Sequence, residues 1–283
     1  MNRRQLIDYG RQTLEAHDII NSHNDAWLLF AYVTGINRVS YLMSPAEAVP
    51  PEQEEKYKRC IEKRAAHYPL QYITHTQAFM GLDFYVDENV LVPRQDTEVL
   101  VETVLEYLKS DMDVLDMCTG SGCILISLAA NVAVGCGVGA DLSLGALKVA
   151  KTNAALNHTD NLTFVRSDLY EGVDLTFGMK KFDVIVSNPP YIASKEVLAL
   201  MPEVRDHEPV MALDGHDDGL YFYRKIISGA KAHLKENGMI FFEIGWDQAD
   251  SVSELLAAAD FSQIGVKKDL AGLNRVVYAV NNS

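Results

Sequence analysis

The spacing of apolar residues predicts helices in the first part of the chain. Between Leu6 and Leu14, and again between Ala26 and Val33, apolar side chains recur three or four positions apart, as they do on one face of a helix. Asp25 and Ser44 are expected to cap the starts of helices, and a charged, mostly exposed helix is expected over residues 52–66. Residues 1–74 are therefore predicted to form a small bundle of four or five helices.

A different pattern follows over residues 75–92. Short runs of β-branched and aromatic residues end at Met80 and at Val86, and Gly81 lies between them. Glycine permits the backbone conformations that tight hairpin turns require. This segment is predicted to be a β-hairpin that links two domains.

From residue 93 onward, strand-like and helix-like segments alternate. Strands are predicted at Val114–Cys118, Gly137–Asp141, Leu162–Arg166, Phe182–Ser187, Met239–Ile244, Gly265–Asp269 and Arg275–Val280. Helices are predicted between most of them, at Asp96–Ser110, Ser121–Ala130, Ser143–Asn157, Leu220–Glu236 and Asp247–Ala259. Such alternation is typical of a doubly wound, mostly parallel α/β sheet, so residues 93–283 are predicted to form a second domain around seven strands.

The stretch from Met117 to Ala140 contains no charged residue and is long enough to cross a bilayer. It also contains Thr119, Asn131 and several glycines at turn positions, which predict a loop, a buried helix and a second loop between two strands. The strands and helices of a parallel sheet form continuous apolar runs where they are buried on all sides, so this stretch is not expected to span a membrane.

The charge distribution also indicates a boundary near residue 76. Residues 1–76 carry 9 basic and 9 acidic side chains, whereas residues 77–283 carry 16 and 30, which accounts for the whole net charge of −14. An acidic second domain repels a phosphate backbone, which disfavours direct DNA binding, although many soluble enzymes are simply acidic.

The four cysteines are Cys60, Cys118, Cys123 and Cys136. They form no CxxC pair, and no cluster of histidines lies beside them in the sequence. This spacing argues against a metal site or a disulfide framework and favours a reduced, cytoplasmic protein.

A glycine-rich loop follows the first predicted strand of the sheet. The segment Asp116-Met117-Cys118-Thr119-Gly120-Ser121-Gly122 runs from the strand into a helix. Glycines let a ligand approach the backbone closely, and the start of a helix presents free N–H groups. Within this segment, the candidate cofactor-binding residues are Asp116, Cys118, Thr119, Gly120, Ser121 and Gly122. The alternative is a tight turn without a ligand, and a left-handed backbone at Cys118 would be costly.

The second predicted strand ends at Asp141. A carboxylate at this place can accept hydrogen bonds from both hydroxyls of a ribose, as in nucleotide-binding folds. The same side chain can cap the helix that begins near Ser143, and the two roles are compatible.

The most informative segment is the tetrapeptide Asn188-Pro189-Pro190-Tyr191, which follows a buried strand. A planar NH2 group is a weak nucleophile because its lone pair is delocalised. The Asn188 side-chain oxygen and the Pro189 carbonyl can accept its two hydrogens, the prolines stiffen the loop, and Tyr191 offers a flat face for a planar amide or base. These four residues are the candidate catalytic and substrate-binding residues, and a rigid turn without function is the alternative.

The order of these motifs resembles class I methyltransferases and, more specifically, the release factor N5-glutamine methyltransferases of the HemK or PrmC type. The tetrapeptide resembles that of amino-methyltransferases. Three further segments carry the resemblance, namely Val92–Glu98, Glu208–Leu213 with Asp218–Leu220, and Phe242–Gln248. The resemblance covers residues 92–280, and the helical N-terminal domain and the hairpin match as well.

This resemblance implies a Rossmann-like domain that uses S-adenosylmethionine, releases S-adenosylhomocysteine and needs no metal. It implies that the glycine loop passes beneath the methionine part of the cofactor, that Asp168 and Leu169 flank the adenine, and that Asn188 contacts both cofactor and substrate. The implied substrate is the glutamine of the Gly-Gly-Gln motif in peptide chain release factors, with residues 1–74 helping to hold that protein during a modification that modulates translation termination. A monomer without direct contact to DNA or to a membrane is expected.

Other interpretations stay open. The tetrapeptide also occurs in enzymes that methylate adenine N6 or guanine N2, although neither a basic face nor a base-reading domain is evident. A non-catalytic binding module that kept a nucleotide fold would bind the cofactor without turnover. Arg94 and Glu98 either line the site or form a surface ion pair, and we favour a structural role in a loop that closes the cofactor pocket. His207 is not expected to act as a base, because the N–H proton can leave after methyl transfer.

Overall fold

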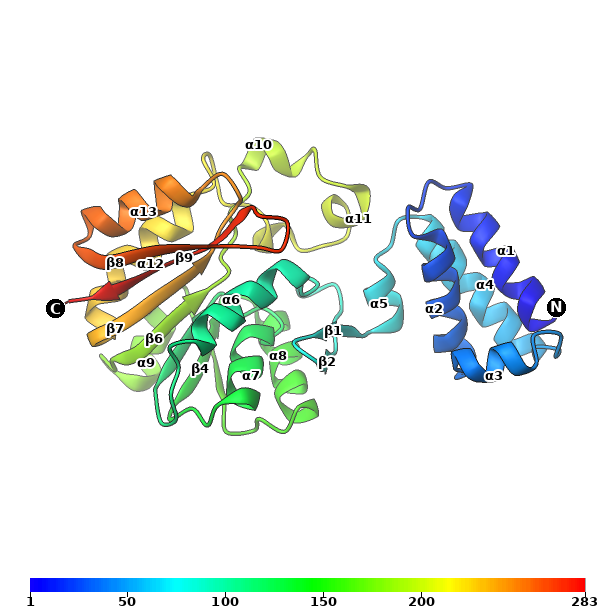
Figure 1. Ribbon diagram of the computed structural model, residues 1–283, viewed down its shortest axis with the longest axis horizontal. Helices are drawn as coiled ribbons and strands as arrows, with labels where there is room; N and C mark the ends of the chain where they lie inside the picture. The colour runs from blue at the N-terminus through cyan, green and yellow to red at the C-terminus, as the bar shows by residue number, and fades with distance from the viewer. Residues whose placement is uncertain (283) are drawn as a thin grey trace. The chain divides into compact units, whose positions relative to one another are not determined.

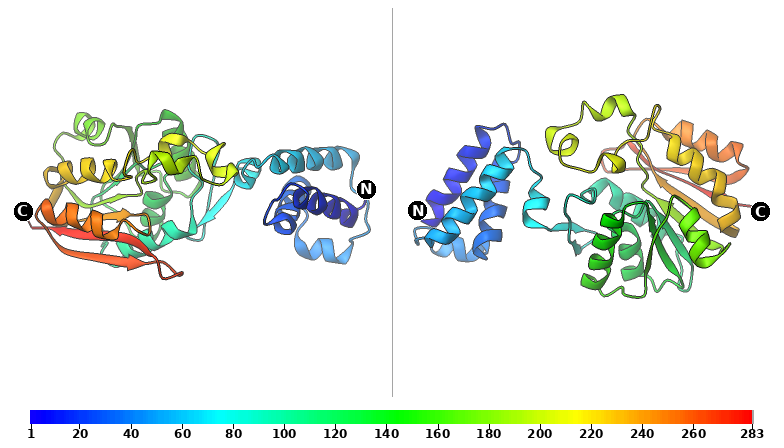
Figure 2. Two further views of the ribbon diagram at one scale, coloured as in Figure 1. Left: turned by 90° about the horizontal axis from the view of Figure 1, so that it is seen from above. Right: turned by 180° about the vertical axis from the view of Figure 1, so that it is seen from behind.

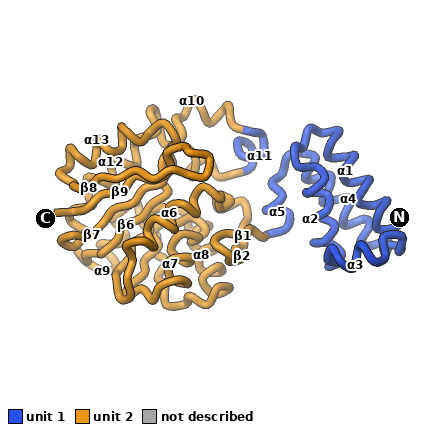
Figure 3. Tube along the Cα trace, in the orientation of Figure 1, with its two compact units in different colours: residues 1–75, 201–207 blue, residues 76–200, 208–283 orange. Residues whose placement is uncertain are grey.

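The computed structural model describes residues 1–282, which divide into two compact units (Figure 3). The first unit consists of residues 1–75 together with residues 201–207, and the second contains the rest of the described chain. The break after residue 75 lies next to the change in sequence pattern. The return of residues 201–207 to the first unit was not predicted from the sequence.

The first unit is helical, as predicted. Its helices are α1 (Arg3–Glu15), α2 (Ser22–Thr34), α3 (Arg38–Met43), α4 (Pro51–Ala65), α5 (Leu70–Thr74) and the short α11 (Pro202–Arg205). Leu6, Leu29 and Phe30 are fully buried in its core. Gly10 allows α1 to lie close to α4, because a Cβ atom at this position would be 2.0 Å from the Tyr57 hydroxyl.

Both expected helix caps in this unit are wrong. The residue before α2 is Asn21, and Asp25 lies inside the helix, where it is buried and accepts a 2.7 Å hydrogen bond from Arg64. Ser44 follows the end of α3, and residues 45–48 are not helical. Arg64 also lies 2.8 Å from a carboxylate oxygen of Glu203, which anchors α11 on α4. The cap prediction failed because an Asp near a helix start can also be a buried ion-pair partner.

The second unit is built on a mixed, mostly parallel sheet (Figure 1). Its strands are β3 (Val114–Met117), β4 (Gly137–Asp141), β5 (Thr163–Arg166), β6 (Phe182–Ser187), β7 (Leu234–Glu243), β8 (Phe261–Lys268) and β9 (Asn274–Asn281). Over residues 1–282 the sheet has seven strands in the order β5-β4-β3-β6-β7-β9-β8, and only the pairs that include β9 are antiparallel. The predicted doubly wound sheet is therefore confirmed.

Helices cover both faces of this sheet (Figures 1 and 2). One set consists of α6 (Gln95–Leu105), α7 (Cys123–Asn131) and α8 (Leu144–Leu156), and the other of α9 (Glu171–Phe177), α12 (Tyr221–His233) and α13 (Ala249–Ala258). Alternate residues of a strand point to opposite faces. In β6, Val184 and Val186 pack in the core cluster that contains α6 to α8, whereas Ile185 packs in the cluster that contains α12 and α13.

The predicted hairpin is present and consists of β1 (Gln77–Phe79) and β2 (Leu82–Phe84), which pair antiparallel. Its two turn residues, Met80 and Gly81, have φ angles of 51° and 75°. The backbone N–H of Met80 donates a 2.6 Å hydrogen bond to the Glu98 carboxylate, so the turn is attached to the first turns of α6.

Two helices end earlier than the sequence pattern predicts. Helix α6 ends at Leu105, and α12 ends at His233 because Leu234 already begins β7 opposite Phe182. The next residue, Lys235, is charged and therefore looked like part of an exposed helix.

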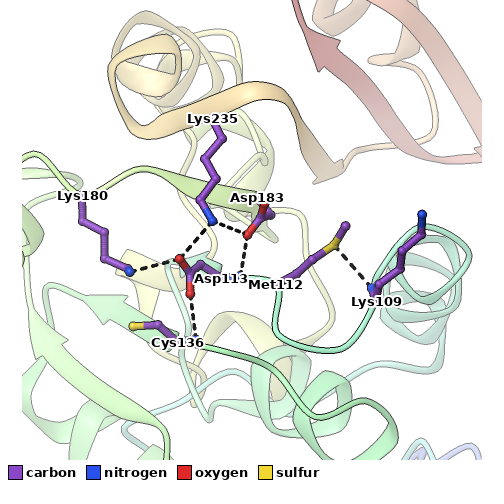
Figure 4. A network of polar contacts seen from close by, with 7 residues as sticks. All are labelled: Lys109, Met112, Asp113, Cys136, Lys180, Asp183 and Lys235. Atoms are coloured by element: carbon purple, nitrogen blue, oxygen red, sulfur yellow. Dashed lines mark hydrogen bonds and ion pairs between the residues drawn. The ribbon is translucent and has the colours of Figure 1, made fainter.

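A network of charged groups surrounds Lys235 at the beginnings of β3, β6 and β7 (Figure 4). The Lys235 ammonium lies 2.7 Å from Asp183 and 3.2 Å from Asp113, and Lys180 lies 3.0 Å from Asp113. These contacts connect the amino ends of the central strands. The loops that carry the predicted motifs leave the sheet at its opposite edge, where these strands have their carboxyl ends.

The stretch from Met117 to Ala140 folds as predicted, as the end of β3, a loop, the buried helix α7 and the start of β4. Among residues 1–282, no helix combines the length and the apolar character that crossing a membrane would require.

Candidate active site

The glycine loop and the tetrapeptide leave the sheet side by side. Strands β3 and β6 are neighbours, their last residues Met117 and Ser187 are paired, and the Ser187 hydroxyl donates a 2.6 Å hydrogen bond to the Met117 carbonyl. The strands that follow them lie on opposite sides, since β4 flanks β3 and β7 flanks β6. Ligands of doubly wound folds bind at such a reversal, beyond the carboxyl ends of the strands.

A cavity of about 410 Å³ opens at this reversal, within the usual size range of small-molecule sites. Nine of the predicted site residues line it, namely Cys118, Thr119, Gly120, Ser121, Asp141, Asp168, Leu169, Asn188 and Pro190. The structure thus brings four segments to one cavity: the glycine loop, Asp141 at the end of β4, the turn after β5 with Asp168 and Leu169, and the tetrapeptide.

Four predicted site residues, Asp116, Gly122, Pro189 and Tyr191, are not among those that line the cavity. Asp116 is fully buried and accepts a 2.5 Å hydrogen bond from the Thr119 hydroxyl. Burial raises the pKa of its carboxyl to about 7, although the Thr119 hydrogen bond opposes this shift. Gly122 has a φ of 79° and directly precedes α7, and a Cβ atom there would lie 2.9 Å from Ile126.

Asp141 fixes the glycine loop from the neighbouring strand. Its two carboxylate oxygens accept hydrogen bonds of 2.9 Å each from the backbone N–H groups of Gly120 and Ser143. Burial raises the pKa of this carboxyl, and the N–H groups of Ser143 and Gly120 oppose the shift. The cap of α8 is Ser143, whose hydroxyl accepts from the Ala146 N–H, so Asp141 supports the loop rather than capping that helix.

The glycine loop is left-handed at a residue that is not glycine. Cys118 has a φ of 61°, and Gly120 has a φ of 55°. Burial and the nearby Asp141 raise the pKa of the Cys118 thiol, so this side chain stays an uncharged thiol.

The corner after β5 is organised by Ser167. Its hydroxyl accepts a 2.8 Å hydrogen bond from the Gly172 N–H and donates to the Leu169 carbonyl. Leu169 has a φ of 49° and packs partly buried against the core, whereas Asp168 is exposed beside the cavity.

Within the tetrapeptide, both polar side chains form hydrogen bonds with residues of other elements, α6 and β7. The Asn188 NH2 group donates a 3.3 Å hydrogen bond to the Thr97 hydroxyl, and the Tyr191 hydroxyl donates a 3.3 Å hydrogen bond to Glu243. The Tyr191 ring packs against the core, and burial raises the pKa of its phenol. The predicted stacking face of Tyr191 is thus partly occupied by the protein itself.

Glu243, at the end of β7, is 2% exposed. Burial raises the pKa of its carboxyl to about 7, and this shift is opposed by a hydrogen bond from Thr97 and by the positive charge of Arg275. One of its oxygens, Oε2, is buried without a hydrogen-bond partner among the described residues.

Arg94 and Glu98 do not pair with each other. Glu98 binds the hairpin turn, whereas Arg94 lines the cavity and donates a 2.6 Å hydrogen bond to Glu208. His207 belongs to the first unit, where its ring lies 5.1 Å from that of Tyr68. Among residues 1–282 there is no group of three or more His, Cys, Asp or Glu side chains placed to hold a metal ion.

Sequence reasoning assigned no role to Thr97. A signal was present, because Thr97 lies on the apolar stripe of α6 with Leu100, Val101 and Val104, and it is 3% exposed. A hydroxyl on such a stripe needs a hydrogen-bonding partner. The cavity is also lined by residues 209–212, which sequence reasoning placed in a loop without naming them as lining.

Comparisons with known proteins agree with these motifs. The family model described as "PrmC N-terminal domain" matches residues 5–74, and the one described as "Methyltransferase small domain" matches residues 94–204. A protein of Clostridium acetobutylicum named "Release factor glutamine methyltransferase" is 40% identical over 279 residues, which cover 94% of this chain and 96% of that protein. A protein of the same name from Geobacter sulfurreducens is 38% identical, covering 97% and 95% of the two chains.

The fold also has solved counterparts. A crystal structure of a methyltransferase from Pyrococcus furiosus superposes with a TM-score of 0.52 over 73% of this chain and 92% of that chain. The two sequences are 18% identical, so this likeness concerns the fold of the sheet and its helices.

Proposed function

The chain belongs to the family of release factor glutamine methyltransferases, and on this premise we propose that it methylates the side-chain N5 of the glutamine in the Gly-Gly-Gln motif of peptide chain release factors. The methyl donor in this proposal is S-adenosylmethionine, and the reaction modulates translation termination. The observation that carries the proposal is that Asn188 and the loop Cys118–Ser121 line one cavity.

The residues of the cavity fit the proposed cofactor. The Asp141 carboxylate is already fixed by two backbone N–H groups and retains lone pairs for ribose hydroxyls. The left-handed turns at Cys118 and Gly120 leave the loop backbone open toward the cavity, and a Cβ atom at Gly120 would meet nothing within 4 Å. Asp168 and Leu169 are proposed to flank the adenine. When bound, the cofactor supplies an activated sulfonium methyl group.

Asn188 and Pro189 are proposed to orient the target. The Asn188 Oδ1 atom and the Pro189 carbonyl would accept the two hydrogens of the glutamine amide and hold its nitrogen in line with the methyl group. Orientation of this kind can supply several kcal/mol of a reaction barrier, roughly 7–11 kcal/mol at the upper end. We further propose that residues 1–74 help to bind the release factor and that residues 75–92 act as the linker.

The proposal is tested by incubating the purified protein with S-adenosylmethionine and a release factor, followed by peptide mass spectrometry. One added methyl group on the glutamine of the Gly-Gly-Gln motif is expected. A release factor with that glutamine replaced by alanine should stay unmodified, as should wild-type release factor with Asn188→Ala protein. Labelling of ribosomal RNA or DNA in place of the release factor would reject the proposal in favour of a nucleic acid methyltransferase.

A further inference from the structure

The Asn188 side chain is held by a chain of groups that lies outside the tetrapeptide and the glycine loop. Its Nδ2 atom donates a 3.3 Å hydrogen bond to the Thr97 hydroxyl, which belongs to the first turn of α6. The Thr97 side chain is also one of the groups that lower the pKa of the Glu243 carboxyl, at the end of β7, by hydrogen bonding. The elements α6, β6 and β7 all belong to the second unit, where they can be followed in Figure 1.

The direction of these hydrogen bonds matters for the reaction. Asn188 must present Oδ1 to a target NH2 group, because its own Nδ2 is a donor and cannot accept hydrogens. The two ends of a side-chain amide have nearly the same shape, so a rotation of half a turn exchanges them at no steric cost. A hydroxyl such as that of Thr97 can either donate or accept, and therefore favours neither orientation by itself.

Glu243 removes this ambiguity. An ionised carboxylate only accepts hydrogen bonds, so it takes the single hydroxyl hydrogen of Thr97. The Thr97 oxygen then faces Asn188 with a lone pair, which requires Nδ2 there and turns Oδ1 away. Burial raises the pKa of the Glu243 carboxyl to about 7, and the positive charge of Arg275 opposes this shift, so the carboxyl is mostly ionised at about pH 8. The Tyr191 hydroxyl donates to the same carboxyl and thereby ties the end of the tetrapeptide to it.

We propose that Thr97 and Glu243 are positioning residues that set the orientation of the Asn188 amide, so that Oδ1 rather than Nδ2 faces the glutamine of the substrate. This inference rests on the proposed function for its catalytic consequence. It gives a physical reason for a threonine on the apolar stripe of α6. It also connects two segments that are 91 positions apart in the sequence.

The first test compares Thr97→Val with Thr97→Ser at about pH 8, above the pKa of about 7 of the Glu243 carboxyl. Valine keeps the shape without the hydroxyl, so kcat should fall about 10-fold to 100-fold while KM for the release factor and the affinity for S-adenosylhomocysteine change less than about three-fold. Serine restores the hydroxyl and should restore kcat to within about three-fold of the parent.

A matched control is available on the same helix. Thr103 is 2% exposed, and its hydroxyl donates only to the Val99 carbonyl, so Thr103→Val removes a buried hydroxyl from α6 without touching the Asn188 chain. This variant should keep the parent kcat. A Thr97→Val protein that binds S-adenosylhomocysteine and keeps the parent kcat would overturn the inference, as would a Thr97→Ser protein as slow as Thr97→Val.

A double substitution tests whether the two residues act in one chain. Glu243→Gln can both donate and accept, so it should lower kcat, though less than Thr97→Val does. Adding Glu243→Gln to Thr97→Val should lower kcat no further, because the link to Asn188 is already broken. Independent losses that multiply would contradict the proposed chain.

A readout that does not depend on turnover separates this inference from the proposed function. The side-chain NH2 resonances of Asn188, assigned by their absence in Asn188→Ala protein, should shift in Thr97→Val and return toward the parent position in Thr97→Ser. If the release factor is not methylated by the parent but these shifts occur, the proposed function fails and the orientation by Thr97 stands. If the resonances are the same in Thr97→Val and the parent, the inference fails whatever the activity.

Discussion

The Arg94 guanidinium donates a 2.6 Å hydrogen bond to the carboxylate of Glu208, which lies 114 positions further along the chain. The Glu208 side chain is 2% exposed and the Arg94 side chain 41% exposed, so a surface cation holds a buried anion. Arg94 and the residues directly after Glu208, 209–212, line the cavity. The contact therefore closes the cavity between the segment that enters α6 and the loop that follows the tetrapeptide.

We expect Arg94→Met to weaken the binding of S-adenosylhomocysteine about 10-fold and to lower the free energy of unfolding by about 1–3 kcal/mol, since a buried carboxylate loses its cation but water can approach it. Isothermal titration calorimetry measures the affinity for S-adenosylhomocysteine, and urea unfolding measures the change in stability. Lys267→Met is the control, because Lys267 binds Glu106 at 3.0 Å in a pair whose side chains are 38% and 52% exposed. Equal losses in the two variants would show that the buried carboxylate has no special effect.

The sheet could be predicted from the sequence because the patterns that specify each strand and helix lie within that element or directly after it. Each strand and helix repeats its own apolar period, and the glycine loop and the tetrapeptide directly follow strands. In a parallel sheet, consecutive carboxyl ends meet at one edge, so the meeting of Cys118 and Asn188 at one cavity follows from topology alone.

Contacts between distant segments could not be predicted in the same way. Thr97 and Asn188 are 91 positions apart, and Arg64 and Glu203 are brought together although residues 201–207 follow a stretch of the second unit. The repeat of apolar positions along a single sequence carries no information about which distant residues form such pairs. The early end of α12 has a related cause, because the charge of Lys235 is accommodated by Asp113 and Asp183 from two other strands.

The left-handed backbone at Cys118 gives a prediction that reverses a common rule. Glycine usually destabilises a protein relative to alanine because it has more freedom when unfolded. At a φ of 61°, however, any Cβ atom adds strain of roughly 1–2 kcal/mol, and alanine keeps this strain whereas glycine relieves it. Cys118→Gly should therefore be more stable than Cys118→Ala, as measured by urea unfolding. The opposite order would mean that the loop adopts another backbone conformation in solution.

Asp116 predicts how stability changes with pH. Burial raises the pKa of its carboxyl from 3.8 to about 7, so between these values the folded protein keeps a proton that the unfolded chain releases. The contribution of Asp116 to stability therefore decreases as the pH rises from about 4 to about 7, by roughly 1.4 kcal/mol per unit of raised pKa. Asparagine cannot ionise and still accepts from Thr119.

The stability gain of Asp116→Asn over the parent should accordingly be small at about pH 4, grow through the window and reach a plateau above about pH 7. Urea unfolding at a series of pH values gives this difference directly. Asp160→Asn removes the same charge from an exposed position and serves as the control for the loss of charge alone. A gain that is independent of pH would mean that Asp116 is already ionised at low pH.

The last prediction concerns the buried ion pair of the first unit. Arg64 lies 2.7 Å from Asp25 and 2.8 Å from Glu203, and the side chains of Arg64 and Asp25 are 8% and 6% exposed. Arg64→Met leaves Asp25 buried without its cation, so the free energy of unfolding should fall by about 3–5 kcal/mol. The fluorescence of Trp27 reports on this unit when Trp246 is replaced by phenylalanine.

Arg59 provides the matched control on the same helix, because it pairs with Glu55 at 3.4 Å and both side chains are more than half exposed. Arg59→Met should cost less than about 0.5 kcal/mol, since an exposed pair at successive turns of a helix contributes little. Hydrogen exchange adds a second measurement, because residues 201–207 lose their anchor on α4 only in Arg64→Met and should exchange faster in that variant alone. Similar unfolding curves for Arg64→Met and Arg59→Met, with unchanged exchange in residues 201–207, would show that the buried pair holds neither the bundle nor this segment.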